Sequence, residues 1–158
     1  MIRWINNSCL LIVSLAVVLS LSGCGRSTIN PNSDRVSIRL PDRYLIKAEV
    51  ADTASEREQG LSGRSSLAAD AGMWFVFDQM GRYPFWMIDM NFSIDIIWVD
   101  DALRVVEIDR NISPEPGVAP THLKRYVNQF PARYVLEVPS GTALDHKIKA
   151  GDKFVLIS

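Results

Sequence analysis

Residues 92–99, FSIDIIWV, constrain the fold of this chain more than any other segment. Alternate side chains of a strand point to opposite faces of a sheet. One face of this strand then carries Asp95 and Ile97, and the other carries Ile96 and Trp98. Because apolar residues stand on both faces, we expect a strand that is buried on both, in a sheet that is covered on each side.

Asp95 is the exception in this apolar run. An unpaired carboxylate in such a place costs several kcal/mol or takes up a proton. We therefore expect Asp95 to be mostly buried and to accept hydrogen bonds from Arg64, from Arg133 or from backbone N–H groups. It is interpreted either as part of a buried ion pair that stabilises the fold or as part of a binding or acid/base site.

Glu137 raises the same question in the segment YVLEV, where alternation places it on one face with Val135. Two carboxyls that face one cavity could divide the acid and base roles of a catalyst. They could equally be ion-paired or solvated side chains. Trp86 and Met87 are interpreted as core or rim residues, with a ligand platform as the alternative. The weak catalytic candidates are thus Asp95 and Glu137, and the binding candidates are Arg64, Trp86, Asp95 and Glu137.

The N-terminal residues have the organisation of a secretion signal. Arg3 precedes an uncharged apolar stretch from Cys9 to Leu21, which is too short for a comfortable transmembrane helix. The following LSGC, residues 21–24, resembles the lipobox of bacterial lipoproteins. That resemblance implies cleavage after residue 23 and a lipid on the thiol of Cys24. We predict a signal peptide 1–23, then the lipidated Cys24 and a flexible tether over 24–34.

Removal of the signal peptide determines how many cysteines and charged residues the mature domain keeps. Cys9 leaves with the signal peptide and Cys24 carries lipid, so the mature domain has no disulfide and no thiol nucleophile. Only Arg3 among the charged residues is lost, which leaves 16 basic and 18 acidic residues of the original 17 and 18. Without a basic face, nucleic-acid binding is not expected.

Residues 35–158 read as one β domain. Strand patterns occur in VSIRL, RYLIKAEVA, GMWFVFD, YPFWMID, FSIDIIWV, LRVVEIDR, RYVLEVPS and KFVLIS. Thr53 and Glu56 form a capping box at the start of a short helix, and a second helix is expected near 141–147. A hairpin should join FSIDIIWV to LRVVEIDR, and a proline-rich loop should span about 112–131. We predict a mainly β fold, a β-sandwich or partly closed barrel with two short helices.

Familiar catalytic signatures are missing from the sequence. It has no G-x-S-x-G elbow, H-E-x-x-H pair, phosphate-binding glycine loop or C-x-x-C motif. His122 and His146 lie far apart in the sequence and are interpreted as surface residues. A zinc site needs three or four ligands, so neither a metal nor another cofactor is expected.

Several segments together resemble the DUF192 family, also called UPF0127. They are ADTASEREQGLSGRSSL, GMWFVFD, FWMIDMNFSIDIIWVD, VVEI, PARYVLEVPSG and IKAGD, which span roughly residues 47–157. The resemblance implies a mainly β, sandwich-like fold with small helices, and it supplies no reaction or ligand. The family pattern falls on Gly60, Leu61, Arg64, Leu67, Gly72, Met73, Phe85, Trp86, Met87, Asp95, Tyr134, Glu137, Gly141 and Gly151. The chain departs from the pattern at Ile88, Asp89 and Met90, where Lys-Asn-Thr is usual, and at Ser93 and Ile94, where Pro-Leu is usual.

These observations favour a membrane-anchored envelope lipoprotein whose domain binds a small ligand or another envelope protein without catalysing a reaction. The alternative is a hydrolase-type envelope enzyme that uses Asp95 and Glu137 as an acid/base pair, and a purely structural subunit is a third reading. Gly25 follows the cysteine, where an Asp would resemble an inner-membrane retention signal. We therefore expect the periplasmic side of the outer membrane in a double-membraned bacterium, and otherwise the outer face of the plasma membrane.

Overall fold

The computed structural model describes residues 34–157 of the 158-residue chain. The predicted signal peptide 1–23, Cys24 and the tether as far as Ser33 lie outside the described residues. Within the described range, no helix is long and apolar enough to cross a membrane.

Residues 34–157 form nine strands, two short α-helices and one 3-10 turn. In chain order they are β1 (Arg35–Arg39), β2 (Leu45–Ala51), α1 (Ala54–Gln59), β3 (Ala71–Gly81), β4 (Pro84–Phe85), β5 (Ile94–Val99), β6 (Val105–Ile112), η1 (Pro120–His122), β7 (Tyr126–Val127), β8 (Ala132–Pro139), α2 (Thr142–Asp145) and β9 (Val155–Ile157).

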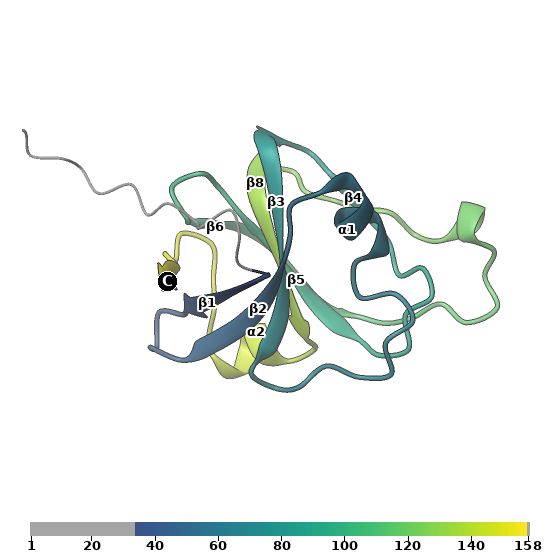
Figure 1. Ribbon diagram of the computed structural model, residues 1–158, viewed down its shortest axis with the longest axis horizontal. Helices are drawn as coiled ribbons and strands as arrows, with labels where there is room; N and C mark the ends of the chain where they lie inside the picture. Colours follow the sequence, from purple (N-terminus) through teal and green to yellow (C-terminus); the bar gives the residue numbers. More distant parts are fainter. Residues whose placement is uncertain (1–33, 158) are drawn as a thin grey trace, which may run out of the picture.

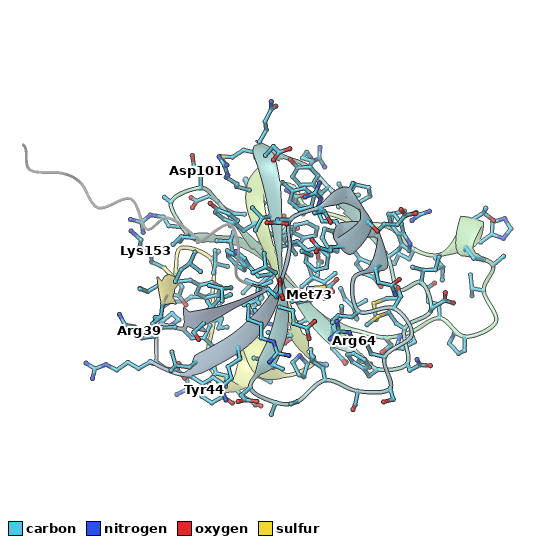
Figure 2. All side chains as sticks on the ribbon, viewed as in Figure 1. Arg39, Tyr44, Arg64, Met73, Asp101 and Lys153 are labelled. Carbon is cyan, nitrogen blue, oxygen red and sulfur yellow. The ribbon has the colours of Figure 1, made fainter. Side chains whose placement is uncertain are left out.

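Seven of these strands form one sheet in the order β6-β5-β8-β3-β2-β1-β9, in which β2 and β3 are parallel and the other pairs antiparallel. The two ends of the sheet approach each other: Arg104 forms a bridge with Lys153, and the Val105 amide donates to the Asp152 carbonyl over 2.8 Å. Asp101, on the β5–β6 turn, and Lys153 accordingly lie on the same side of the molecule (Figure 2). The mainly β prediction is confirmed, in the form of a partly closed barrel.

The sheet carries a separate apolar cluster on each face. The inner cluster includes Ile97, and the outer cluster includes Ile96 and Trp98; all three side chains are at most 1% exposed. The predicted burial of β5 on both faces is therefore confirmed. We call the face with Ile97 the inner face and the face with Ile96 the outer face. Helix α1 and the long connections lie together on one side of the sheet in Figure 1.

Local signals explain most of the elements. The Thr53 side chain accepts from the Glu56 amide while the Glu56 carboxylate accepts from the Thr53 amide, so the predicted capping box starts α1. The predicted hairpin is the antiparallel β5–β6 pair, and the predicted second helix is α2. The interpretation of YPFWMID as a full strand is wrong, because β4 contains only Pro84 and Phe85. Met87, beyond it, is buried in the outer cluster instead of extending a sheet.

Candidate functional site

Glu137 lies on the outer face near the middle of the sheet. In β8 it stands opposite Met73 of β3 and Ile96 of β5, two buried apolar residues. Val135 belongs to the outer cluster as well, which confirms the predicted sharing of a face with Glu137. Neither neighbouring strand places a hydrogen-bond donor directly beside the carboxyl.

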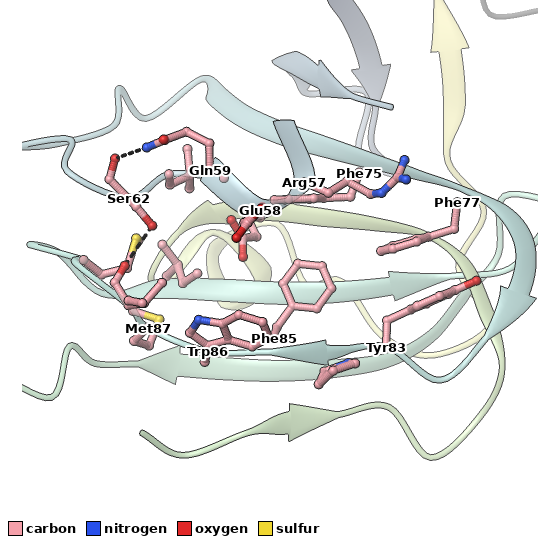
Figure 3. Close-up of a pocket in the computed structure, with 17 residues that line it drawn as sticks. Arg57, Glu58, Gln59, Ser62, Phe75, Phe77, Tyr83, Phe85, Trp86 and Met87 are labelled. Atoms are coloured by element: carbon pink, nitrogen blue, oxygen red, sulfur yellow. Dashed lines mark hydrogen bonds between the residues drawn. The ribbon is translucent and has the colours of Figure 1, made fainter. Parts of the chain in front are cut away.

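Glu137 lines a pocket of about 310 Å³ on the outer face. Helix α1, the middle of β3 and the segment 83–90 form its walls (Figure 3). The Ser62 hydroxyl, after α1, donates to the Ile88 carbonyl over 2.8 Å, and the Gly63 amide donates to the Asp89 carbonyl over 2.8 Å. These bonds join two walls that are distant in sequence, so the pocket exists before any ligand arrives.

Aromatic rings make up much of the pocket wall. The Phe77 and Tyr83 rings lie against each other (Figure 3) and stack with centroids 3.6 Å apart. The Phe85 ring meets the Phe75 ring edge-on, with centroids 5.0 Å apart. Phe85 also packs edge-on against Trp98 at 5.2 Å. Such interlocked rings form a rigid, largely apolar surface, which is typical of small-molecule sites.

The Glu137 carboxyl has no partner in this apolar setting. Its side chain is 6% exposed, and the described residues offer it neither a hydrogen bond nor an ion pair. Burial raises its pKa from 4.5 to about 8, because desolvation penalises the charged form. At neutral pH the pocket therefore holds a mostly protonated carboxyl group.

Arg57 and Glu58 of α1 supply the other formal charges of the pocket lining. The Arg57 guanidinium donates to the carbonyls of Asp52 and Val76 and lies 5.4 Å from the centroid of the Phe77 ring. Glu58 is exposed at the pocket rim. Arg57 is thus held against the wall by backbone acceptors, whereas the Glu58 carboxylate lies in water.

Trp86 also lines the pocket and is only partly buried. The guanidinium carbon of Arg125, from the connection between η1 and β7, lies 3.9 Å from the centroid of its ring. Trp86 therefore lies at the rim of the apolar core rather than at its centre, and a rim position is one of the roles predicted for it.

Asp95 faces the other side of the sheet, and its burial is confirmed at 1% exposure. Its Oδ1 accepts from the Asn111 amide at 2.8 Å, and its Oδ2 accepts from the amides of Gly141 and Ala143 at 3.1 and 2.9 Å. Three backbone N–H groups therefore satisfy the carboxylate, which fastens the start of α2 to β5. The expectation that backbone N–H groups donate to Asp95 is therefore confirmed.

The expectation that Arg64 or Arg133 pairs with Asp95 is wrong. Arg64 instead makes a bidentate ion pair with Glu49, with N–O distances of 2.7 and 2.8 Å, and the hydrogen bonds from Arg64 lower the pKa of Glu49. Arg64 is labelled in Figure 2 on the side of the long connections. The Arg133 guanidinium lies 5.9 Å from the Tyr134 ring centroid, and its buried Nε has no hydrogen-bond partner among the described residues. A loop residue such as Arg64 can point to either side of a sheet, and sequence spacing does not decide which.

Asp95 and Glu137 are not arranged as the acid/base pair that the alternative, enzymatic reading of the sequence requires. Asp95 stands opposite Val138, which belongs to the inner cluster, whereas Glu137 stands opposite Ile96 of the outer cluster. Since adjacent register positions point to opposite faces, the two carboxyls lie on opposite sides of the sheet. No single substrate can contact both.

The two histidines are not assembled into a site. His122 is exposed on η1, and His146 is partly buried, with Nδ1 2.7 Å from Asp42 Oδ2 and its ring stacked on Tyr44. Across residues 34–157 no group of three or more His, Cys, Asp or Glu side chains could hold a metal ion.

Comparisons with known proteins agree with this architecture. The sequence profile of DUF192, described as an uncharacterised group, matches residues 37–156. The chain belongs to the DUF192 family. Two solved structures resemble it with TM-scores of 0.67 each. A Sinorhizobium meliloti protein, provisionally described as a transcription regulator, is 26% identical over 77% of this chain and 92% of its own. A Novosphingobium aromaticivorans protein of unknown function is 28% identical over 84% and 94%. A search of curated proteins found no match.

Part of the pocket wall of this DUF192 domain was not predicted from the sequence. Phe75 and Phe77 alternate in GMWFVFD and so share the outer face, and this spacing was an available signal. No such alternation marked Tyr83, because it lies in the short connection between β3 and β4 rather than in a strand. Ile88 and Met90, two of the positions that depart from the family pattern, also line the pocket.

Proposed function

We propose that this DUF192 protein is an envelope lipoprotein whose domain binds a small, largely apolar ligand in the Glu137 pocket. The observation that carries the proposal is a preformed aromatic pocket of about 310 Å³ with one nearly buried, unpartnered carboxyl on its wall. Pockets of roughly 300–1,000 Å³ with few polar groups are typical small-molecule sites. The volume lies at the lower end, so the occupant is a compact molecule.

The anchor is the second part of the proposal. A basic start, a short apolar core and LSGC occur in the order that a lipoprotein signal requires. Because Gly25, rather than an Asp, follows the proposed lipidated Cys24, the proposal puts the protein on the periplasmic side of the outer membrane, or on the outer face of the plasma membrane in a single-membraned cell. In this proposal the membrane-held domain binds its ligand without catalysing a reaction.

The binding test uses the mature chain from Gly25 without lipid. Both apolar clusters lie between Val36 and Phe154, so this chain retains every packing contact described above. We titrate it with 2-phenylethanol, a compact neutral aromatic probe, and follow backbone amide shifts by NMR. Shifts should concentrate on residues 57–62 and 83–90, with a dissociation constant on the order of millimolar for so small a probe.

A matched pair of variants locates the probe. Phe77→Ala removes a ring from the pocket wall, whereas Phe130→Ala removes a ring that is 59% exposed and does not line the pocket. The first should weaken binding and the second should not. Absence of any saturable shift in the wild type would contradict ligand binding at this site.

A further inference from the structure

The charges of the pocket indicate the ligand's own charge, an inference that rests on the proposed binding function. Two of the three formally charged residues in the lining are acidic, Glu58 and Glu137. The third, Arg57, donates to two backbone carbonyls and lies against Phe77. An anionic ligand would thus meet two carboxyls and a guanidinium that is already engaged.

The aromatic walls also favour a cation. The ring faces carry negative electrostatic potential and attract cations within about 6 Å of the centroid. Two rings of the lining already attract guanidinium groups: Arg125 lies 3.9 Å from the Trp86 centroid, and Arg57 lies 5.4 Å from that of Phe77. These contacts show that the walls accommodate positive charge at close range.

Glu137 supplies the complementary group. Its carboxyl lines the pocket with 6% exposure, and no described residue donates a hydrogen bond to it. A buried carboxylate requires a charged or hydrogen-bonding partner. A ligand cation would provide both at once, because an ammonium group carries the charge and donates its N–H groups.

We propose that the pocket binds an organic ammonium ion with a compact apolar or aromatic body, and that the ammonium nitrogen pairs with the Glu137 carboxylate. The apolar body lies against Phe75, Phe85 and Met87. Where Glu137 is protonated in the free protein, binding releases its proton to solvent, so the bound pair consists of one cation and one carboxylate.

This exchange makes binding depend on pH. The other titratable or charged groups that face the pocket are Arg57 and Glu58 of α1 and Tyr83 before β4, whereas β3 and β5 contribute apolar side chains to its lining. Only the ionised fraction of Glu137, whose pKa is about 8, can pair with the cation. The apparent dissociation constant should therefore rise about tenfold for each pH unit below that value.

Three probes of nearly equal size and different charge test the proposal. They are 2-phenylethylamine, which is a cation below about pH 10 by analogy with lysine, 2-phenylethanol, which is neutral, and 3-phenylpropanoate, which is an anion. Each is titrated into the mature chain at pH 6, 7 and 8 by calorimetry and NMR. At pH 8 the amine should bind at least about tenfold more tightly than the alcohol or the propanoate.

Two carboxyl variants identify the partner of the cation. Glu137→Gln keeps the shape of the side chain but cannot ionise, so the amine should lose about tenfold in affinity at pH 8 and all of its pH dependence. Asp101→Asn, at an exposed carboxylate of the β5–β6 turn that does not line the pocket, should leave both the affinity and its pH dependence nearly unchanged. Near-ultraviolet circular dichroism checks that each variant is folded, and the wild-type pH series tests the proposal independently of both.

The outcomes separate the two proposals. Equal affinity for amine and alcohol at every pH, or tightest binding of the propanoate, overturns the cation inference and leaves ligand binding intact. Equal loss of amine affinity in Asp101→Asn and Glu137→Gln overturns the assignment of Glu137. If no probe binds the wild-type pocket, both the cation inference and the proposed function fall.

Discussion

Asp95 and Glu137 occupy adjacent register positions of β5 and β8, yet their environments differ. Asp95 accepts three backbone hydrogen bonds on the inner face, whereas Glu137 has none on the outer face. Hydrogen bonds to the charged form stabilise a buried carboxylate, and desolvation without them favours the proton. The first residue is therefore suited to stabilising the fold and the second to meeting a ligand.

Replacing Asp95 should destabilise the domain strongly. Asp95→Ala leaves three buried N–H groups without acceptors, and we expect a loss of about 3–5 kcal/mol in the free energy of unfolding. Asp95→Asn should lose less, about 2 kcal/mol, since its amide oxygen still accepts while its NH₂ faces donors. Urea unfolding measures both. Asp101→Ala, at an exposed carboxylate of the β5–β6 turn, is the control and should be nearly neutral. An unfolding curve of Asp95→Ala that matches wild type would contradict the structural role.

Glu137 should make the stability of the domain fall as pH rises. Its folded pKa of about 8 exceeds the ordinary value of 4.5, so the folded state keeps a proton that the unfolded state releases. The stability that the bound proton contributes is fully present below pH 4.5. It is lost progressively as the pH rises toward 8, and the free energy of unfolding falls by about 3–5 kcal/mol in total. Urea unfolding at pH 5, 6, 7 and 8 measures this fall.

The matched variants isolate the contribution of Glu137. Glu137→Gln should remove most of the pH dependence over this range, because the amide does not titrate, while Glu58→Gln should retain it. If the difference in unfolding free energy between wild type and Glu137→Gln is constant from pH 5 to 8, the carboxyl titrates alike in both states and its burial has no energetic effect.

At this scale the sequence singled out both carboxyls but did not indicate what each contacts. The apolar neighbours of Asp95 already indicated that its side chain is buried, whereas for Glu137 the sequence left a solvated or ion-paired position open. The partners of Asp95 come from Asn111, Gly141 and Ala143, which the fold brings to β5 from other segments. Likewise the pocket beside Glu137 forms only when α1 and the segment 83–90 cover the outer face, and no local pattern encodes that arrangement.

At the scale of elements, prediction succeeded where the determinants are local. The capping box of α1 and the β5–β6 hairpin depend on residues close in sequence, and both are confirmed. The segment YPFWMID has high strand propensity but pairs only at Pro84–Phe85, because its side chains are used to cover the outer face. The pairing of β9 with β1 links opposite ends of the domain, so alternation alone could not reveal it.

Asn128 anchors the long connection between β6 and β8 and carried no recognisable signal in the sequence. It is fully buried, donates to the carbonyls of Gly81 and Phe130, and accepts from the Tyr83 amide over 2.9 Å. Asn128→Ala leaves three backbone groups without partners, and we expect a loss of about 2–4 kcal/mol. Gln129→Ala, at the exposed neighbouring position, should be close to neutral.

Hydrogen exchange tests the local effect of this anchor. The Tyr83 amide should exchange faster in Asn128→Ala than in the Gln129→Ala control, because its acceptor is lost. Since Tyr83 lines the pocket, binding of 2-phenylethanol should weaken as well. Unchanged protection of the Tyr83 amide would show that the connection is held in place by other contacts.

At the scale of the whole molecule, one curved sheet serves two purposes. Its inner face closes on itself through the Arg104–Lys153 bridge and forms a core that includes Trp74 and Phe154. Its outer face is covered by α1 and the long connections, which leave the pocket between them. The inner core can therefore stabilise the domain independently of the ligand, while the cover on the outer face provides the binding surface.

The anchor gives the last prediction, and it concerns the full-length protein. Wild type should fractionate with membranes and have the mass of a chain that lacks residues 1–23 and carries acyl groups on Cys24. The diacylglyceryl and amide-linked chains of a lipoprotein together exceed the two lipid signals that stable anchoring requires. Ten extended residues, Gly25 to Asp34, span roughly 33–36 Å, so the tether can hold the pocket clear of the bilayer surface.

Cys24→Ser should carry no acyl mass and should retain the signal peptide, since cleavage of the signal peptide follows lipidation. Cys9→Ser is the matched control and should behave as wild type, because Cys9 is removed with the signal. A soluble wild-type protein, or one without acyl mass, would show that Cys24 is not an anchor.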